Sequence, residues 1–567
     1  MMAARRHALR WSLWLLVSMP ALVTILLVFT YAVDVPFWDE WVVAGLLEEI
    51  SGPGINLQAL VGQHNEHRML VPRAIQLAAA LLVGRWDTRV GMWISQCLLI
   101  AMMAGCVVLW RRSLINHSSV RALVCLVAVA LILFSPAQHQ NLLWGFQLCF
   151  FIPAACLLAS VLVISSPTSS LGLVLTVAAI CCTVATFSIV PGLLTWPLSA
   201  AALLLTRPPR RDDLRKWLGW LACGAAVAVA YFLTYQPPAG TPSTWPVLTA
   251  PVVLLRGLAA CLGGFMAVGT QPVRSATVAG SVVMAVFAWL ALTLWRHRSD
   301  LSLLRASTPW FVMGSFGVVT AFAISVGRVG YGLVAMLESR YTSFTGWTLI
   351  AIVMLSAILS ERLGMVSATR MFSSVVVATG VLSALAMPHH LQSIQRSYSE
   401  RLQSLAIYTF AEVASRAHPM LPPWVAWPPF RDQLFDLEQR GWRARRPAAP
   451  TWIIDDEDTG CRVGTVEFQT TSGGRTLAGG WTYLPHRGQP ANAVLVTVAS
   501  NSSRRIVTVQ PPVLGRADVG QAFDTERALV TGWTVEAPTP PSGETLEFWA
   551  LDVSALRAFR LCHTGQR

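Results

Sequence analysis

The stretch WSLWLLVSMPALVTILLVFTYAV, residues 11–33, carries no charged side chain. As a helix that rises 1.5 Å per residue, it is long enough to cross the hydrocarbon core of a bilayer, which is about 30 Å thick. It follows the basic segment MMAARRHALR, and it is longer than the apolar core of a signal peptide, with no clear cleavage site after it. We therefore predict an uncleaved membrane anchor with a cytoplasmic amino terminus.

Apolar runs of this kind recur along the chain as far as residue 388. The 567 residues are 54% hydrophobic and only 13% charged, which is about half the charged fraction of an ordinary globular chain. Further runs begin near Val90, Ala122, Leu142, Leu171, Pro191, Trp217, Ala276, Pro309, Phe344 and Met371. The predicted fold class is a polytopic α-helical membrane protein with about eleven transmembrane helices, in a range of roughly 10 to 13.

Charge in the loops predicts how these helices are oriented. The stretches RRSLINHSSVR, RPPRRDDLRKW, RHRSDLSLLR and ERLG are predicted to face the cytoplasm. The loop of residues 34–73 and the stretches SPAQHQN, QPPAGTPSTW and GRVGYGLVAMLESRYT then face outward. Two apolar stretches stay open. VPRAIQLAAALLVG is short enough to lie along the interface, and APVVLLRGLAACLGGFMAVG, which carries Arg256, is interfacial, re-entrant or spanning.

The net charge of +13 comes mainly from arginines in these short loops. Because loop arginines set membrane topology, the charge does not indicate nucleic-acid binding, and we expect no nucleic-acid partner. The partner that the composition does indicate is the lipid bilayer.

The character of the chain changes after residue 388. We divide it into a transmembrane domain (1–388), a helical connector (389–447) and a C-terminal domain (448–567). In the last of these, turn residues separate the short runs TVEFQT, AVLVTVAS, RIVTVQ, ALVTGWTV and TLEFWALD. This spacing predicts an extracytoplasmic, antiparallel β-sandwich.

Four residues of the C-terminal domain each allow two interpretations. Cys461 and Cys562 lie near its two ends and form either a disulfide, as an extracytoplasmic location would allow, or two free thiols. Trp481 and Trp533 follow glycines in predicted strands. They are either glycan-stacking platforms or, as we favour, core residues.

The acidic motif VPFWDEW, residues 35–41, closely follows the first span. Its two tryptophans favour the membrane interface, where a partly desolvated carboxylate suits general-base chemistry. Adjacent side chains point apart in regular structure, so at most one of Asp39 and Glu40 is the expected base. We favour Asp39 for its shorter, more rigidly placed side chain. The alternative is that the two acids cap the next helix or pair with an arginine.

The stretch QHNEHR, residues 63–68, is the densest polar motif. On a helix, His64 and His67 would share one face. Three interpretations stay open: a divalent-metal site of both histidines and a carboxylate, a network that holds sugar and phosphate, or a structural network at the interface. No other cofactor is predicted. Glu66 is the third candidate for the catalytic base, after Asp39 and Glu40. The substrate-binding candidates are His64, Asn65, His67, Arg68 and Arg73. The alternative for Arg73 is snorkelling to the headgroups.

The outer-loop stretch NLLWGFQ supplies Asn141, Trp144 and Gln147. An aromatic ring with two amides suits a cluster of sugar hydroxyls. The alternative is packing at the membrane interface, which is the commoner use of such residues.

The outer-loop stretch ESRYTSF supplies two further candidates. Guanidinium geometry suits phosphate oxygens, so Arg340 is a candidate phosphate ligand, and Arg328 is a weaker one. Tyr341 is a candidate for stacking on, or hydrogen bonding to, a sugar. The alternative for Arg340 is a salt bridge with Glu338.

The polar motifs all lie in predicted outer loops, whereas no span that we place carries an ionisable side chain in its middle. This distribution indicates an active site at the outer membrane surface, supplied from the bilayer. A sugar on a polyprenyl phosphate fits, because phosphate leaves without a dedicated acid. The enzyme then needs a base for the acceptor hydroxyl, cations for the phosphate and an apolar groove for the lipid. Direct attack on the anomeric carbon would invert its configuration.

Together, VPFWDEW, QHNEHRMLVPR, NLLWGFQ, TFSIVPGLLTWP and SRYTSF resemble a bacterial subgroup of the C-class (GT-C) membrane glycosyltransferases. The resemblance covers about residues 11–388, with fewer predicted spans than the larger members. It implies a polyprenyl-phosphate sugar as donor. It also implies a catalytic carboxylate in the first outer loop, which corresponds best to Asp39, with Glu40 as runner-up. It also implies the bacterial inner (plasma) membrane as location and a glycan, lipid or protein as acceptor. The predicted sandwich resembles accessory domains that often hold glycan.

Two other function classes stay open. A transporter or flippase for a lipid-linked glycan would need a polar path through the bilayer, and the uncharged spans argue against it. An anchor or receptor that displays the sandwich would not need so many spans. Asp39→Asn should abolish catalysis but leave transport or display almost unchanged. The short cytoplasmic loops leave no room for a nucleotide-binding domain, so we do not expect a nucleotide sugar as the direct donor.

Overall fold

The structure is a computed structural model, and it divides the chain into two units. It describes all residues except 1, 53–56, 117–118, 208–210, 239–241, 243–248, 411–435, 444–451, 456–461, 501–502, 525–529 and 565–567. The first unit comprises Met1–Ala32, Ile55–Ala78 and Arg89–Ser393. The second unit comprises Val33–Gly54, Ala79–Thr88 and Ile394–Arg567. Two N-terminal segments therefore belong with the C-terminal unit, across the boundary that the sequence predicted at residue 388.

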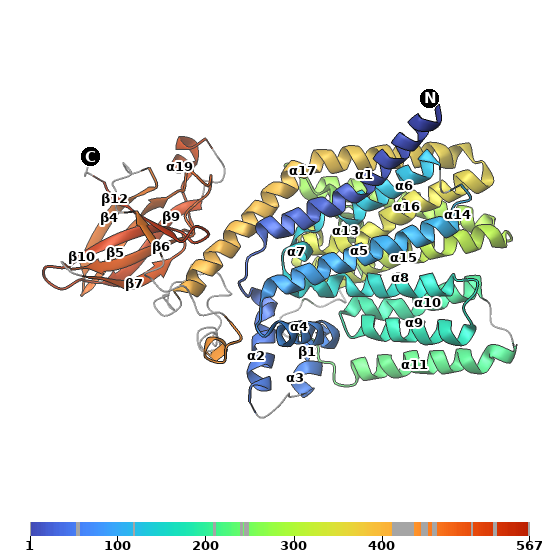
Figure 1. The fold of residues 1–567 in the computed structure, drawn as a ribbon, viewed down its shortest axis with the longest axis horizontal. Helices are drawn as coiled ribbons and strands as arrows, with labels where there is room; N and C mark the ends of the chain where they lie inside the picture. The colour runs from blue at the N-terminus through green and yellow to red at the C-terminus, as the bar shows by residue number, and fades with distance from the viewer. Residues whose placement is uncertain are drawn as a thin grey trace. The chain divides into compact units, whose positions relative to one another are not determined.

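The first unit is helical (Figure 1). Its longer elements are α1 (Met2–Tyr31), α5 (Thr88–Ser113), α6 (Val120–Leu133), α8 (Ile152–Ile164), α9 (Leu171–Thr186), α10 (Thr195–Thr206), α11 (Leu214–Phe232), α13 (Pro251–Leu262), α14 (Pro272–Arg296), α15 (Leu301–Arg328), α16 (Thr342–Leu363) and α17 (Val366–Thr409). The last of these continues beyond the predicted domain boundary into the second unit. The composition of the chain already required such helices, because only internally bonded backbone is stable in a bilayer.

Eight apolar helical segments of the described residues are long enough to cross a membrane, as expected for a multi-pass membrane protein. They are Arg10–Tyr31, Thr88–Ser113, Val120–Leu142, Gly145–Ile164, Pro272–Arg296, Leu301–Tyr331, Ser339–Leu363 and Val366–Thr409. Four further apolar helices have 10–17 residues: Leu70–Val83 (α4), Leu171–Thr186, Val190–Thr206 and Pro251–Leu262. Two predicted spans, those beginning near Leu171 and Pro191, thus correspond to short helices.

Close backbone contact explains part of the packing of the first unit. A side chain added at Gly280 in α14 would collide with the carbonyl of Ala259 in α13, and one added at Gly263 would collide with Ala276. Small residues let helix backbones approach in this way. They are common at helix interfaces in membranes, where the hydrophobic effect does not drive helices together.

Three of the basic stretches meet at one end of the first unit, which we call the basic end. There Arg362 Nη2 donates to the carbonyl of Ser113 at 2.9 Å, and its Nη1 donates to Ser302 Oγ at 2.7 Å. Glu361 accepts the backbone N–H of Asn116 at 2.8 Å. Three of the stretches predicted to share one side of the membrane are therefore bonded to one another.

The first segment of the second unit, Val33–Gly54, carries the acidic motif. It includes a 3-10 turn, η1 (Trp38–Glu40), and the helix α2 (Trp41–Ile50). The tightly turned η1 leads directly into α2, and the helix buries Trp41, Val43 and Leu47.

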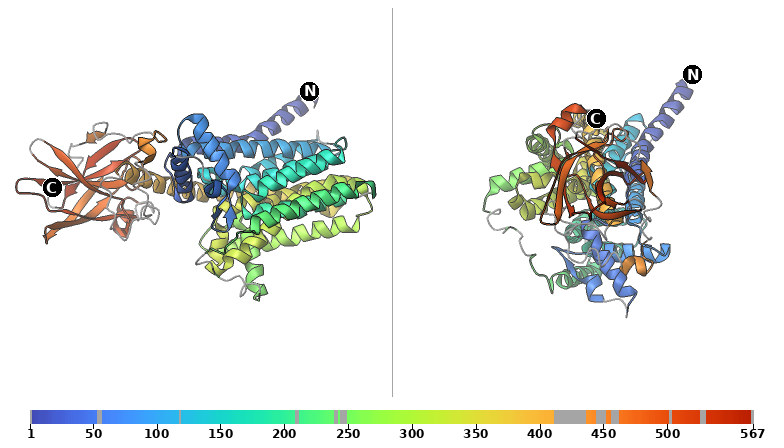
Figure 2. Two further views of the ribbon diagram at one scale, coloured as in Figure 1. Left: turned by 90° about the horizontal axis from the view of Figure 1, so that it is seen from below. Right: turned by 90° about the vertical axis from the view of Figure 1, so that its left-hand side faces the viewer.

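The C-terminal part of the second unit contains two five-stranded sheets (Figure 2). Their strand orders are β3-β11-β10-β6-β7 and β12-β4-β5-β9-β8. The strands are β3 (Ile453–Asp455), β4 (Gly464–Ser472), β5 (Arg475–Thr482), β6 (Ala493–Ala499), β7 (Arg504–Gln510), β8 (Leu514–Gly515), β9 (Val530–Pro538), β10 (Thr545–Asp552), β11 (Arg557–Arg560) and β12 (Cys562–His563). Most neighbours are antiparallel, but β3 and β12 pair in parallel with β11 and β4. The prediction of a purely antiparallel arrangement is therefore wrong at these two edges.

Residues of both sheets share one hydrophobic core, which includes Val496, Trp533 and Phe548. Trp533 is 0% exposed, so it cannot offer a ring face to a glycan, and its favoured interpretation as a core residue is confirmed. Trp481 is half-buried, and its ring centroid lies 5.9 Å from that of Phe523. Cys562 is disulfide-bonded, whereas Cys461 lies outside the described residues.

Candidate functional site

The stretch QHNEHR forms a tight hairpin and not a helix. Its strands are β1 (Gln63–His64) and β2 (His67–Arg68), and His64 pairs directly with His67. The turn is possible because Asn65 adopts a positive φ of 50°, a conformation that asparagine tolerates better than most residues. The two histidines are therefore cross-strand neighbours, whereas a helix would have placed them along one face.

Glu66 projects from this turn into an ion pair. Its Oε1 pairs with Arg328 Nη2 at the end of α15, and His67 Nε2 lies 3.8 Å from the same oxygen. The hydroxyl of Tyr231 donates to the backbone carbonyl of Glu66 at 3.1 Å. Because its carboxylate is engaged with a cation, Glu66 is a weaker candidate for a catalytic base than the sequence indicated.

The two arginines after the turn are buried behind it. Arg68 donates to the carbonyl of Tyr231 at 2.6 Å and to Thr234 Oγ1 at 2.7 Å. Arg73 Nη1 donates to three loop carbonyls, those of Ala59, Leu60 and Gly62. Arg68 is only 5% exposed, and Arg73 is only 3% exposed. The structure therefore gives both arginines the role of holding loops in place. The sequence had predicted that their guanidinium groups face a phosphate, but here they are buried and bonded to the protein.

The stretches AQHQNLLW and ESRYTS, nearly 200 residues apart, are joined by hydrogen bonds. Asn141 Nδ2 donates to the carbonyl of Arg340 at 2.8 Å and to Ser343 Oγ at 2.5 Å. Ser343 in turn donates to Gln138 Oε1 at 2.8 Å, and Gln140 Oε1 accepts the backbone N–H of Arg340 at 3.3 Å. We call the end of the first unit formed by residues 63–68, 137–147 and 328–343 the polar end. Its network fixes the backbone of Arg340 on both sides.

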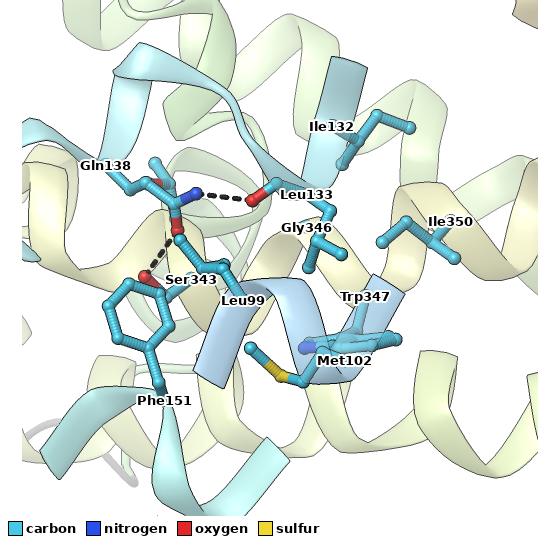
Figure 3. A pocket seen from close by; sticks show the side chains of 11 residues that line it. Leu99, Met102, Ile132, Leu133, Gln138, Phe151, Ser343, Gly346, Trp347 and Ile350 are labelled. Atoms are coloured by element: carbon cyan, nitrogen blue, oxygen red, sulfur yellow. Dashed lines mark hydrogen bonds between the residues drawn. The ribbon is translucent and has the colours of Figure 1, made fainter. Parts of the chain in front are cut away.

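A small cavity lies directly beneath this network (Figure 3). Gln138 and Ser343 form its polar wall, while Trp347, Met102 and Phe151 are among its apolar walls. It has room for about one water molecule. The cavity is too small for a sugar or a lipid chain.

The side chain of Arg340 is the most distinctive feature of the polar end. Its guanidinium carbon lies 5.6 Å from the ring centroid of the buried Tyr341. Within the described residues, no carboxylate pairs with Arg340, and its Nε has no hydrogen-bond acceptor. The alternative, a salt bridge between Arg340 and Glu338, is not formed among the described residues. Glu338 Oε2 instead accepts a hydrogen bond from Gln140 Nε2 at 3.3 Å.

Trp144 and Gln147 are buried among the 3-10 turns before α8, at 8% and 2% exposure. Gln147 Oε1 has no donor among the described residues. The ring of His64 lies 5.6 Å from that of Phe146 in the same stretch. The structure thus brings the second and third predicted motifs together, with both amides inside the protein.

The two acids of VPFWDEW have different environments in the second unit. Glu40 is 1% exposed, its Oε2 accepts the N–H of Phe37 at 2.8 Å, and it lies within electrostatic reach of Arg401. It thus caps its own turn, as the alternative interpretation of this residue predicted. Asp39 is half-buried in the same turn. The preceding Trp38 has a φ of 46°, an unfavourable conformation for a bulky residue, and strained residues of this kind cluster at active sites, ligand clamps and switch regions.

Sequence reasoning missed a second cluster in this unit, built around Arg443. Arg443 Nη1 donates to Asp34 Oδ1 at 2.9 Å and to the carbonyl of Trp86 at 3.1 Å, and its Nε donates to the hydroxyl of Tyr408 at 3.2 Å. Burial is the largest single influence and by itself would lower the pKa of Arg443, but the charges of Asp34 and Tyr408 and the hydrogen bonds to both together raise that pKa. No local pattern could have indicated this pairing, because the partners are 409 residues apart.

The structure offers no group of three or more His, Cys, Asp or Glu side chains suited to a metal ion within the residues it describes. The histidine pair of the hairpin with Glu66 is thus not such a group, since Glu66 is committed to Arg328. Comparison of the chain with models of protein families, with curated proteins and with solved structures finds no match.

Proposed function

We propose that the protein is a membrane glycosyltransferase that moves a sugar from a polyprenyl phosphate to an extracytoplasmic glycan, lipid or protein. The observation that carries this proposal is the guanidinium of Arg340. Hydrogen bonds fix the backbone of Arg340 at the polar end of a helical, apolar unit, its guanidinium carbon lies 5.6 Å from the ring centroid of Tyr341, and no carboxylate among the described residues neutralises it. A fixed cation of this kind suits an anionic group that arrives from the bilayer.

The charges around Arg340 favour a phosphate as that group. Arg328, a second arginine of this end, is already matched by Glu66. The phenol of Tyr341 lies within electrostatic reach of both arginines. A departing polyprenyl phosphate gains negative charge in the transition state, and a guanidinium placed in advance stabilises that charge without rearrangement.

Asp39 is the proposed base. Its neighbour Glu40 is committed to capping the turn, whereas Asp39 is half-buried and follows a strained residue. In the proposed reaction, Asp39 takes the proton of an acceptor hydroxyl, and the acceptor oxygen forms a bond to the anomeric carbon. The bond from that carbon to the phosphate oxygen breaks, the bonding electrons leave with polyprenyl phosphate, and the anomeric configuration inverts.

The finer architecture belongs to the same proposal. The eight long helices, together with α9, α10 and α11, give about eleven spans. The basic end faces the cytoplasm and the polar end faces outward. The two sheets form an extracytoplasmic β-sandwich with a half-buried Trp481 as a candidate glycan contact. The location is the bacterial plasma membrane.

The test is release of free polyprenyl phosphate by purified protein. A panel of polyprenyl-phosphate sugars is supplied with a crude extract of envelope glycan to wild type, Asp39→Asn and Glu49→Gln. Glu49 is a matched carboxylate of the same unit, on α2. We expect release by wild type and Glu49→Gln but not by Asp39→Asn. Equal release by Asp39→Asn would move the base to Glu40 or Glu66. No release from any donor would favour a transporter of lipid-linked glycan.

A further inference from the structure

The acidic motif is held by a segment from far along the chain. We call residues 436–443 the connector segment. Near the start of the motif, Arg443 Nη2 donates to the backbone carbonyl of Asp34 at 2.9 Å, in addition to the bond from its Nη1 to the Asp34 carboxylate. Beyond its end, Trp442 Nε1 donates to Ser51 Oγ at 2.5 Å, and Arg440 Nη1 to the carbonyl of Glu48 at 3.3 Å. The motif therefore lies between two points of attachment to the same segment.

Arg443 uses the full geometry of its guanidinium at the first of these points. Its side chain is 4% exposed and packs near the rings of Tyr408 and Trp86, with centroid distances of 5.3 and 5.5 Å. Its three nitrogens all donate, to Asp34, Trp86 and Tyr408. A lysine could keep the charge, but it cannot make this planar set of bonds.

Asp34 transmits this constraint to the motif. Its Oδ1 also accepts the backbone N–H of Thr88 at 3.0 Å and the Thr88 hydroxyl at 3.2 Å. The short link to Asp39 contains the buried Val35 and the ring of Pro36, which fixes one backbone angle. The link therefore has little freedom, and the position of Asp34 largely sets the position of Asp39.

We infer that Arg443 is a positioning residue for Asp39: through Asp34 it holds the acidic motif in the geometry that proton transfer needs. This inference rests on the proposed function, because it assumes that Asp39 is the base. The connector segment then takes part in catalysis, although it lies about 400 residues from the acidic motif in the sequence.

The test compares Arg443→Lys with a matched control, Arg557→Lys. Arg557 lies in the same unit, pairs with Asp455 and lies 5.5 Å from the ring of Phe559, but it does not contact the acidic motif. For Arg443→Lys we expect kcat to fall about 10- to 100-fold, with the KM for the donor within about twofold of wild type. For Arg557→Lys we expect both to be unchanged. Tyr408→Phe removes a single acceptor and should lower kcat several-fold in a fully folded protein.

A second readout does not depend on activity. A glutamate-specific protease reports on the acidic motif and α2, which offer Glu40, Glu48 and Glu49 as cleavage sites. We expect Arg443→Lys to speed cleavage there, and Arg557→Lys to leave it unchanged. Lost kcat with unchanged cleavage would overturn the inference, because Arg443 would then act by another route.

The two readouts separate failure of the inference from failure of the proposed function. An active wild type whose Arg443→Lys variant keeps its kcat overturns the positioning role and leaves the proposed function intact. A wild type that releases no polyprenyl phosphate from any donor overturns the proposed function. Faster cleavage of Arg443→Lys would then support only the attachment of the motif by the connector segment.

Discussion

Arg340 in the first unit and Arg443 in the second are both fixed in place, but the protein treats their charges in opposite ways. Arg443 is buried and donates to a carboxylate, a phenol and two carbonyls. Arg340 is held by hydrogen bonds to its backbone, while its side chain meets no carboxylate among the described residues. The contrast separates two uses of arginine. A matched arginine holds the chain together, and an unmatched one is suited to a ligand.

The largest expected effect is on the matched arginine. Arg443→Ala leaves the Asp34 carboxylate without its cation and removes packing from two aromatic rings. We therefore expect the free energy of unfolding of the second unit to fall by roughly 4 kcal/mol. Thermal unfolding of the protein in detergent, followed by circular dichroism, measures this loss. Arg340→Ala serves as the comparison, with an expected change within about 0.5 kcal/mol. Equal losses would break the distinction between the two arginines.

The next effect is on activity, and here the order of the two arginines reverses. Arg340→Ala removes the proposed phosphate ligand, so we expect kcat/KM for the polyprenyl-phosphate sugar to fall about 100-fold, which corresponds to about 2.7 kcal/mol. Arg340→Lys should recover part of this, since charge remains but the planar fork is lost. Initial rates of polyprenyl phosphate release measure both. An unchanged rate in Arg340→Ala would remove the observation on which the proposed function rests.

Asp552 in the sheets tests whether matched charges hold the chain together elsewhere too. Burial would raise its pKa, but hydrogen bonds from Ser554, Arg487 and His486 outweigh this and hold the pKa below its usual range. Such a carboxylate contributes stability above its unfolded pKa of about 3.9, and this contribution is lost as pH falls through the lower folded value. We expect Asp552→Asn to cost about 2 kcal/mol at pH 7 and less near pH 2. Unfolding measured at both pH values checks this, and a pH-independent difference would contradict it.

The smallest effect sharpens the comparison within one pair. Glu66→Gln removes the carboxylate that matches Arg328 and thus leaves the charge of Arg328 available to a ligand at the polar end. We expect the donor KM to fall two- to threefold, about 0.5 kcal/mol, with kcat unchanged. Steady-state kinetics in low salt measures this. If Glu66→Gln instead abolished turnover, Glu66 would replace Asp39 as the base.

The parts of the structure that the sequence predicted depend on composition and local pattern. Long uncharged runs required helices, and three of the basic stretches that were expected to share one side of the membrane, ERLG among them, are bonded to one another. The assignment of Trp533 to the core followed from its place after a glycine in a strand. These features depend on neighbours in sequence, so one chain suffices to predict them.

The rest depends on contacts or on small choices of backbone conformation. The spacing of His64 and His67 places them on one face only if QHNEHR is a helix, and the sequence left that open; Asn65 in the left-handed region makes the stretch a hairpin. The parallel edge strands β3 and β12 are too short to show a period. The pairing of Asp34 with Arg443 has no local trace at all, and it reassigns the acidic motif to the C-terminal unit.

The discontinuity of the second unit has a consequence in time. Its first segment ends at residue 54, but its last begins at residue 394. Asp34 and Arg443 are separated by 409 residues, which a ribosome translates in roughly 20 to 80 s. During that interval the acidic motif has already been made, but the residue that fixes it does not yet exist. A nascent or truncated chain would therefore carry the proposed base without its final geometry. The protein would become active only after residue 443 has been translated and has bonded to Asp34.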